Sequence, residues 1–295
     1  MNGTLLIFVL KLIELCDDEH VLNALIKFHF NTGGKKTKKH NLMLYIMCVC
    51  VCVCVCGRIV GGYTPSPNSV KYIVSLQSSK GQHFCSGSLV HKSWVLTAAH
   101  CNIGCMMVVA GDYTLGAYEG TEQYSKPLSL IPHPQYNRST NNADIMLIKL
   151  GVPIELNRYV SLAPLPKQNA GLLAGSMCRV SGWGSTSHSG GLTPLTLRTV
   201  KLPIVSTSKC NSSNSFSGNI TANMICAGSS TGGKDVCKGD SGGPLVCDGR
   251  VYGLVSWGNG CGDSRFPGVY TAVSRFLNAK TYPEKKKSFY KNITQ

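Results

Sequence analysis

The chain has 295 residues, and its 29 lysine and arginine residues against 14 aspartate and glutamate residues give a formal net charge of +15. This length suits two folded units or one large one. A basic chain can favour nucleic acid, heparin-like polyanions or acidic membranes, but no basic helix with interleaved aromatic residues occurs, which argues against a nucleic-acid partner. We therefore interpret the charge as a general surface property and keep affinity for an anionic glycan as a hypothesis.

Residues 1–58 form an atypical leader or propeptide, for which three interpretations are open. The apolar stretch 5–10 is followed closely by charged residues, unlike a secretory signal. The basic stretch 35–39 precedes fifteen apolar residues at 42–56, which suit an internal signal or a short signal-anchor. Cysteine and valine alternate strictly over 48–56, as a translated dinucleotide repeat would, and we favour this third interpretation, a gene-model artefact.

From residue 69 onward, short apolar runs are separated by glycine, proline, asparagine and serine. The runs that we expect to be strands are 72–76, 88–90, 94–96, 106–109, 145–150, 245–247 and 251–257. Several short strands with turn signals between them indicate a β-barrel or a β-sandwich. About 220 residues are enough for a substantial core.

A serine with unusual neighbours occurs at Ser241, between Asp240 and two glycines. Glycine permits a turn that exposes the hydroxyl and points backbone N–H groups at one spot. A polar surface turn is the alternative. A serine becomes a strong nucleophile only when a base takes its proton and a third group orients that base.

His100 and Asp144 are the best candidates for the base and the orienting group. His100 ends an apolar run among small residues and a cysteine, and Asp144 opens an apolar run. Buried carboxylates are rare unless they are paired, and a neutral imidazole that needs orientation is a natural partner. A structural core histidine is the alternative for His100, and the other histidines after residue 58, which include His83 and His133, are most simply surface side chains.

The chain from about 59 to 276 resembles the trypsin-like serine proteases of the chymotrypsin fold, both vertebrate trypsins and granule-type enzymes. The motifs that carry the resemblance are Ile59-Val60-Gly61-Gly62, Thr97-Ala98-Ala99-His100-Cys101, Asp144-Ile145-Met146-Leu147, Ser181-Gly182-Trp183-Gly184, Gly239-Asp240-Ser241-Gly242-Gly243-Pro244 and Ser256-Trp257-Gly258. The resemblance implies an all-β fold of two packed six-stranded antiparallel barrels, with the active site in the cleft between them.

This resemblance also implies a division of the chain. The protease domain would cover 59–279, with barrels at about 59–160 and 175–279 and a connection within 160–175. A basic tail, 280–295, would follow. The C-terminal helix of the family is doubtful here because Pro283 would break it.

By the same resemblance, Ser241 is the nucleophile of a serine endopeptidase, His100 its base and Asp144 the residue that orients His100. The N–H groups of Gly239 and Ser241 would form the oxyanion hole. Asp235 would lie at the base of the specificity pocket and select arginine or lysine. Val236 takes a position where trypsins often have serine, and the loss of that hydroxyl would favour arginine over lysine. The substrate-binding residues would be Asp235, Ser256, Trp257, Gly258 and Gly268.

The resemblance predicts a zymogen. Another trypsin-like protease would cut after Arg58, and the new α-amino group of Ile59 would pair with Asp240 to form the oxyanion hole. The partners implied are protein and peptide substrates, protein protease inhibitors and this activating protease. We expect a monomer that needs no cofactor for catalysis.

Nine cysteines follow residue 58. The resemblance pairs eight of them, as Cys85–Cys101, Cys178–Cys247, Cys210–Cys226 and Cys237–Cys261. Cys105 is left over, as an intermolecular link or, as we favour, a buried free thiol. Four bridges favour a secreted protein or a secretory granule.

Two further features concern a candidate calcium loop and candidate glycosylation sites. The stretch 112–122 is similar to the calcium loop of trypsins, and Asp112, Glu119 and Glu122 would supply hard oxygen ligands for a structural Ca²⁺ ion; a solvated acidic loop is the alternative. Triplets typical of N-glycosylation begin at Asn137, Asn211, Asn219 and Asn292.

Two other hypotheses remain from the sequence. One is a catalytically silent homologue that acts as a binding protein, although such proteins usually lack the histidine or the serine. The other is a product that does not fold because the gene model is wrong at its two ends.

Overall fold

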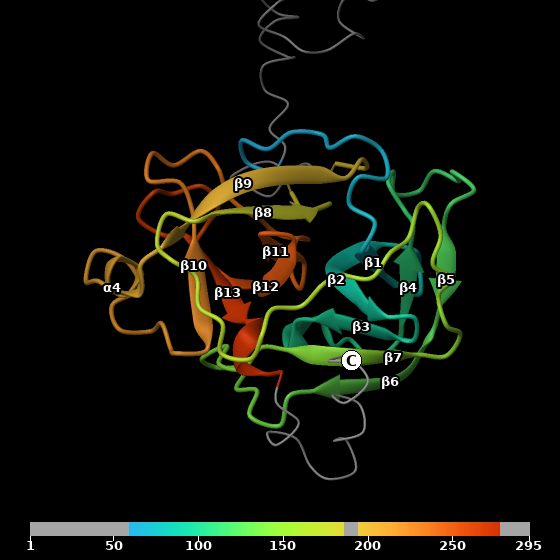
Figure 1. Cartoon of the computed structure of the whole chain (residues 1–295), viewed down its shortest axis with the longest axis horizontal. Coiled ribbons are helices and arrows are strands. Elements are labelled where there is room, and N and C mark those ends of the chain that lie inside the picture. The colour runs from blue at the N-terminus through green and yellow to red at the C-terminus, as the bar shows by residue number, and fades with distance from the viewer. Residues whose placement is uncertain (1–58, 186–193, 278–295) are drawn as a thin grey trace, which may run out of the picture. The chain divides into compact units, whose positions relative to one another are not determined.

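Two β-sheet units carry the fold in the computed structural model, which describes residues 59–185 and 194–277 (Figure 1). The first sheet has seven strands in the order β5-β4-β1-β2-β3-β7-β6. Its strands are β1 (Ile73–Ser78), β2 (His83–His91), β3 (Trp94–Thr97), β4 (Met106–Ala110), β5 (Gln123–Ser125), β6 (Pro127–Pro132) and β7 (Met146–Leu150). Neighbouring strands are antiparallel throughout, so short turns suffice to connect them.

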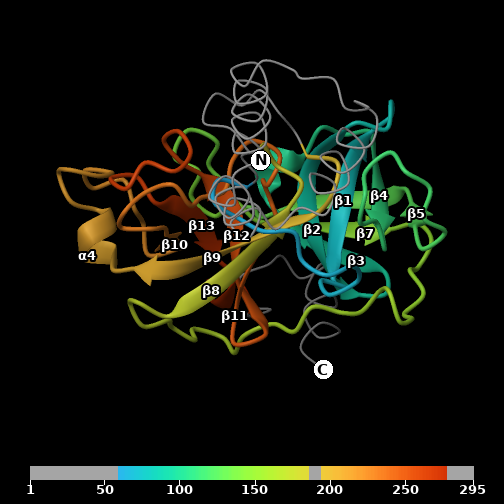
Figure 2. The ribbon, with the colours of Figure 1, turned by 90° about the horizontal axis from the view of Figure 1, so that it is seen from above.

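The second sheet closes into a six-stranded barrel in the order β10-β13-β12-β11-β8-β9. Its strands are β8 (Met177–Gly182), β9 (Arg198–Val205), β10 (Met224–Ala227), β11 (Pro244–Cys247), β12 (Arg250–Trp257) and β13 (Gly268–Ala272). Figures 1 and 2 show this barrel beside the first sheet, with the short helix α4 (Thr207–Cys210) at its outer edge. The all-β prediction is confirmed, and the second sheet is the expected six-stranded barrel. The first sheet, called the first barrel below, is a half-barrel of seven strands where a six-stranded barrel was expected.

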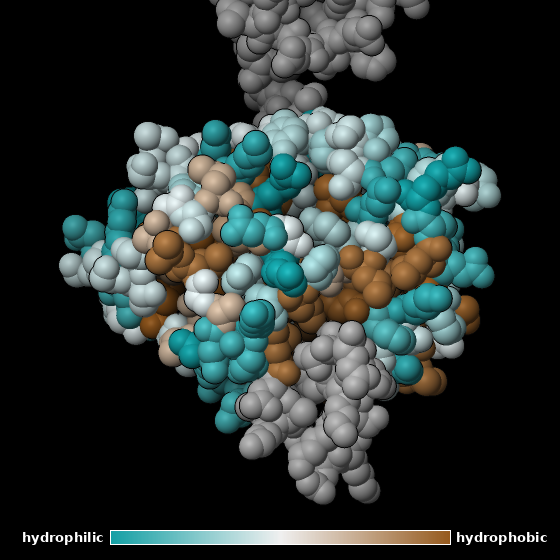
Figure 3. All heavy atoms as spheres, viewed as in Figure 1, coloured by the Kyte–Doolittle hydropathy of each residue, from teal (hydrophilic) through white to brown (hydrophobic). Residues whose placement is uncertain are grey.

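Side-chain alternation explains why each sheet has an interior. In β1, Val74 and Leu76 point into the first barrel and pack with Leu89, Val108 and Ile148, all fully buried. Burying one such side chain contributes about 1.5–3 kcal/mol. On the face shown in Figure 3, hydrophobic residues form separate patches among hydrophilic ones.

A separate apolar cluster joins residues of both sheets. Leu96 and Leu147 from the first sheet pack in one cluster with Leu254 of β12 and with Val273, which begins the 3₁₀ turn Val273–Arg275 after β13. The cluster fixes the ends of β3 and β7 against the second barrel. His100 and Asp144 lie beside these strand ends, after β3 and before β7.

Four disulfides lie within the described residues, and they join the same pairs that the resemblance implied: Cys85–Cys101, Cys178–Cys247, Cys210–Cys226 and Cys237–Cys261. The expectation of a buried thiol at Cys105 is wrong, because this free cysteine is exposed. It lies in a surface turn before β4, where Gly104 donates its N–H to the Asn102 side chain.

Several predictions fall outside the described residues. These are the interpretations of the leader, the activation residue Arg58, the doubtful C-terminal helix, the basic tail and the triplet at Asn292. Among the described residues, no helix is long and apolar enough to cross a membrane.

Candidate active site

His100 and Asp144 form the centre of the site. His100 lies in the 3₁₀ turn Ala99–Cys101, directly after β3, and Asp144 comes two residues before β7, the strand that pairs with β3. The Asp144 carboxylate accepts from His100 twice, from the ring Nδ1 at 2.7 Å and from the backbone N–H at 2.9 Å. The disulfide from Cys101 to Cys85 ties this turn to β2.

Asp144 is fully buried, and two further hydrogen bonds hold it. The Ser256 hydroxyl donates to Oδ2 at 2.6 Å, and the Thr271 hydroxyl donates to the Asp144 carbonyl at 2.8 Å. Ser256 and Thr271 belong to β12 and β13, so the second barrel fixes the carboxylate that orients a histidine of the first. The bond at Nδ1 leaves Nε2 of His100 as the nitrogen that can accept a proton.

Ser241 lies in the turn before β11, and the first barrel holds its backbone. Its carbonyl accepts from the Ser86 N–H at 2.7 Å. Gly239, two residues earlier, has a φ of 99°, a conformation that favours glycine. Within the described residues, the N–H groups of Gly239 and Ser241 have no hydrogen-bond partner. Two such unpaired N–H groups beside a serine are the donors that an oxyanion needs.

Asp240 points away from the cleft into the protein. It is fully buried, and its carboxylate accepts from the N–H groups of Gly184 at 2.8 Å and Cys237 at 2.9 Å. Burial raises the pKa of this carboxyl to about 7, although these two hydrogen bonds act in the opposite direction. A side chain at position 184 would collide with the carboxylate, so glycine is required there.

The segment that begins at Ile59 is docked in the second barrel. The Ile59 side chain is fully buried in the core of this barrel, with Val180, Val200 and Tyr270 in the same cluster. The Val60 carbonyl accepts from the Asp235 N–H at 3.1 Å.

A cavity of about 380 Å³ opens beside Ser241 and contains all five predicted substrate-binding residues. Its lining includes Asp235, Val236, Ser241, Ser256, Trp257, Gly258 and Gly268. Asp235 is only 4% exposed, and its two carboxylate oxygens accept from the N–H groups of Val236 at 2.8 Å and Gly262 at 2.7 Å. The cavity is therefore a slot that has a buried carboxylate in its lining.

The structure shows one residue behind this slot that the sequence analysis missed, the fully buried Tyr270. The hydroxyl of Tyr270 is buried without a hydrogen-bond partner among the described residues, and it lies with Asp235 around Gly268. Burial, and then the charge of Asp235, raise the pKa of Tyr270 well above its ordinary value. Its place two residues after Gly268, on the same face of β13, was the signal that could have revealed it.

His83 and His133 are not surface side chains, as the sequence analysis expected. His133 is 3% exposed. One ring nitrogen of His83 contacts the Gly239 carbonyl at 2.9 Å and the other contacts the Ser75 hydroxyl at 2.8 Å. Burial lowers the pKa of His83 to about 4, so the ring is neutral at pH 7. It supports the carbonyl of Gly239.

The acidic loop brings its three predicted residues together. Oxygens of Asp112, Glu119 and Glu122 lie within 4.8 Å of one another. Burial first, then the charges of the two glutamates, raise the pKa of Asp112 to about 6. Its Oδ1 is buried without a hydrogen-bond partner in the described residues, so this hard-oxygen set fits a Ca²⁺ ion.

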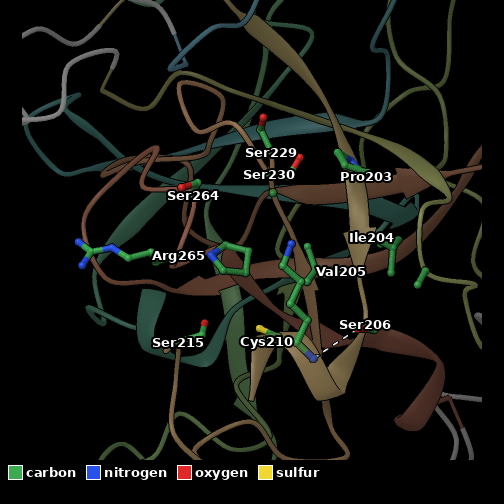
Figure 4. Close-up of a pocket in the computed structure, with 14 residues that line it drawn as sticks. Pro203, Ile204, Val205, Ser206, Cys210, Ser215, Ser229, Ser230, Ser264 and Arg265 are labelled. Carbon is green, nitrogen blue, oxygen red and sulfur yellow. Dashed lines mark hydrogen bonds between the residues drawn. The ribbon is translucent and has the colours of Figure 1, made fainter. Parts of the chain in front are cut away.

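A separate pocket of about 260 Å³ contains none of the predicted site residues except a disulfide cysteine, Cys210. Figure 4 shows its lining, which includes Pro203, Ile204, Ser215, Ser264 and Arg265. Arg265 is already paired with Asp263 at 2.7 Å. This pocket is not the candidate active site.

Comparison with known proteins identifies the family of this site. A family model described as trypsin matches residues 59–280. Trypsin of Sus scrofa is 48% identical over 221 residues, which cover 75% of this chain and 93% of that protein. Trypsin-3 of Salmo salar is 50% identical over 219 residues, 74% of this chain and 90% of that protein. Trypsin I-P1 of Gallus gallus is 48% identical over 221 residues, 75% of this chain and 87% of that protein. The chain belongs to the trypsin family of chymotrypsin-fold serine proteases and is a serine endopeptidase.

Proposed function

We propose that this endopeptidase cleaves peptide bonds after arginine or lysine. The observation that carries the proposal is the slot beside Ser241 with the buried Asp235 carboxylate in its lining. A guanidinium or ammonium group would pair with this charge, whereas an apolar side chain would cover it and leave it unpaired. Gly258 and Gly268 leave the slot open for a long side chain.

The proposed reaction uses Ser241, His100 and Asp144. The Ser241 oxygen attacks the scissile carbonyl while His100 Nε2 takes the hydroxyl proton. His100 then gives this proton to the leaving amine, and water repeats the sequence on the acyl-enzyme. The buried Asp144 carboxylate favours the charged imidazolium because it already accepts from Nδ1 at 2.7 Å. The N–H groups of Gly239 and Ser241 bind the oxyanion, and one such donor typically contributes about 2.7–4 kcal/mol.

We also propose that the chain is a zymogen activated by cleavage after Arg58. The pKa of Asp240 rises from an ordinary value near 3.8 to about 7, so keeping this carboxylate ionised at pH 8 costs about 4 kcal/mol. A cation beside it offsets that cost, and the α-amino group of a cleaved Ile59 supplies one. Arg58→Gln should block activation by added trypsin, whereas full activity of the uncleaved chain would contradict the proposal.

The remaining proposals follow from this chemistry. Four disulfides within the described ranges 59–185 and 194–277 suit secretion or storage in a secretory granule. Protein protease inhibitors would occupy the same slot as substrates. Asp112, Glu119 and Glu122 would hold a structural Ca²⁺ ion, which takes no part in the proposed proton transfers.

The test is hydrolysis of matched peptides that differ only in the residue before the cleaved bond: arginine, lysine, tyrosine or alanine. The chain is expressed with a cleavable leader ahead of Ile59, activated, and compared with Ser241→Ala. Cleavage after arginine and lysine that the variant lacks would support the proposal. Cleavage after tyrosine would overturn the role of Asp235, and no cleavage by folded protein would favour a silent binding protein.

A further inference from the structure

Two positive charges face each other on the outside of the second barrel. Strands β8 and β9 run side by side (Figure 1), and their register places Arg179 directly opposite Lys201. Both side chains are exposed, because the residues on either side of them along the strands point into the barrel core. Like charges in such a pair destabilise a sheet. The pair therefore does not contribute to the stability of the barrel, and it points to a ligand that it could bind.

One described acidic residue, Asp248, lies near this pair, in the lining of a hollow that Arg179 and Lys201 also line, but it forms no ion pair with either cation. Neither Arg179 nor Lys201 forms an ion pair within the described residues. On the other side of Arg179, strand β11 places Val246. Most of the described acids are used elsewhere, buried at Asp144, Asp235 and Asp240, gathered in the loop at Asp112, Glu119 and Glu122, or paired at Asp263.

A hollow of about 360 Å³ lies against the pair. Its lining residues are Ser69, Tyr72, Met177, Cys178, Arg179, Lys201, Val246, Asp248 and Gly249. None of them lines the catalytic slot. Arg179 and Tyr72 line the same hollow, and burial raises the pKa of the Tyr72 phenol although the charge of Arg179 acts in the opposite direction. The hollow thus offers a guanidinium, an ammonium and two hydroxyl groups as donors.

We propose that this hollow binds one sulfate group of a sulfated glycan of the heparin type. A sulfate monoester presents three acceptor oxygens, which suits several converging donors better than a planar carboxylate with two. The basic surface continues beside the hollow, since Lys71 and Arg250 adjoin its residues Tyr72 and Gly249 in the chain. A polyanionic chain would follow this surface from one anchored sulfate group, and Asp248 would repel a second anion from the same hollow.

The test compares two double variants that each remove two positive charges. Arg179→Gln with Lys201→Gln alters the hollow, and Lys80→Gln with Lys92→Gln alters two exposed lysines elsewhere. Binding of a heparin decasaccharide to the full chain is measured by titration calorimetry over a range of salt concentrations. The first pair should lose about tenfold or more in affinity, with a salt slope reduced by about 2, because two ionic contacts disappear. The control pair should change less than about twofold.

Two outcomes would overturn the proposal. An equal loss of heparin affinity in both double variants would mean that the glycan binds only through the general surface charge. Equal displacement of the decasaccharide by polyglutamate of the same charge would mean that the hollow prefers an acidic polypeptide. The single variant Asp248→Asn provides an independent check. Because Asp248 lines the same hollow, removing its negative charge should tighten heparin binding by about twofold, and unchanged affinity would contradict the proposed position of the sulfate.

Discussion

Replacing Asp235 by serine should remove cleavage after arginine and lysine while the protein stays folded. The carboxylate is 4% exposed, and it accepts hydrogen bonds from the N–H groups of Val236 and Gly262. A substrate cation that enters the slot exchanges water for this carboxylate. Without the carboxylate, the cation would be buried unpaired, which costs about 3–5 kcal/mol. That range corresponds to a loss of about 10² to 10⁴ in kcat/KM.

The assay measures kcat/KM for matched arginine, lysine and tyrosine peptides with the activated wild type and variant. Asp263→Ser is the matched control, since it makes the same change at an aspartate that pairs with Arg265 on the surface. Arginine and lysine peptides should lose activity only with Asp235→Ser, and the tyrosine peptide should lose little or gain. The control should stay within about twofold of the wild type.

Undiminished cleavage after arginine by Asp235→Ser would refute this reasoning, because the cation would then be recognised elsewhere. An equal loss for all three peptides would refute it as well. It would show that Asp235 supports the structure of the slot rather than its choice of substrate.

Three further predictions follow. Calcium should raise the Tm at pH 8 and much less at pH 5, because the pKa of Asp112 is raised to about 6 and protons compete with the ion below that pH. Glu119→Gln should weaken this stabilisation. A Tm that EDTA does not change at pH 8 would exclude the ion. Val236→Ser should raise the kcat/KM of lysine peptides relative to arginine peptides, because Val236 lines the slot and a hydroxyl there can accept from an ammonium group; an unchanged ratio would contradict this. In a secreted preparation, glycosidase treatment and peptide mapping should find a glycan at Asn137, which is exposed, and none at Asn211, whose side chain is bonded twice to the Ile220 backbone at 2.9 and 3.2 Å; the reverse pattern would contradict this assignment.

The sequence was sufficient for seven of the thirteen strands among the described residues. All seven predicted runs lie within or overlap strands β1, β2, β3, β4, β7, β11 and β12. Strands β5, β6, β8, β9, β10 and β13 were missed; β10 is a short apolar run that was overlooked, and several of the others have weaker patterns. Strand β5 is three residues long at the sheet edge, β6 begins and ends with proline, and β9 interrupts its apolar residues with Lys201 and Pro203. Their pairing depends on neighbours distant in the chain, which a local pattern does not contain.

The candidate site also contains residues that the sequence predicted and residues that it did not. Short motifs located His100, Asp144 and Ser241, because each motif encodes its own local turn. The environments of His83 and His133 come from distant segments, so sequence reasoning placed both on the surface. The prediction of a buried thiol at Cys105 was wrong for a different reason. Free cysteines are generally buried, but a local turn places this one on the surface.

The docked segment at Ile59 has a practical consequence for anyone who modifies this protein. We propose above that cleavage after Arg58 frees Ile59, whose side chain is fully buried while the Val60 carbonyl accepts from the Asp235 N–H. A purification tag or fluorophore on that freed end would keep a charged α-amino group from forming there. Fusion partners therefore belong ahead of the proposed cleavage site, where activation would remove them. A probe used near pH 7, where an α-amino group is far more reactive than a lysine side chain, would likewise discriminate between molecules, since a docked terminus would resist labelling and an undocked one would accept it. The fraction labelled at Ile59, located by peptide mapping, would then count the cleaved molecules in which this segment is not docked.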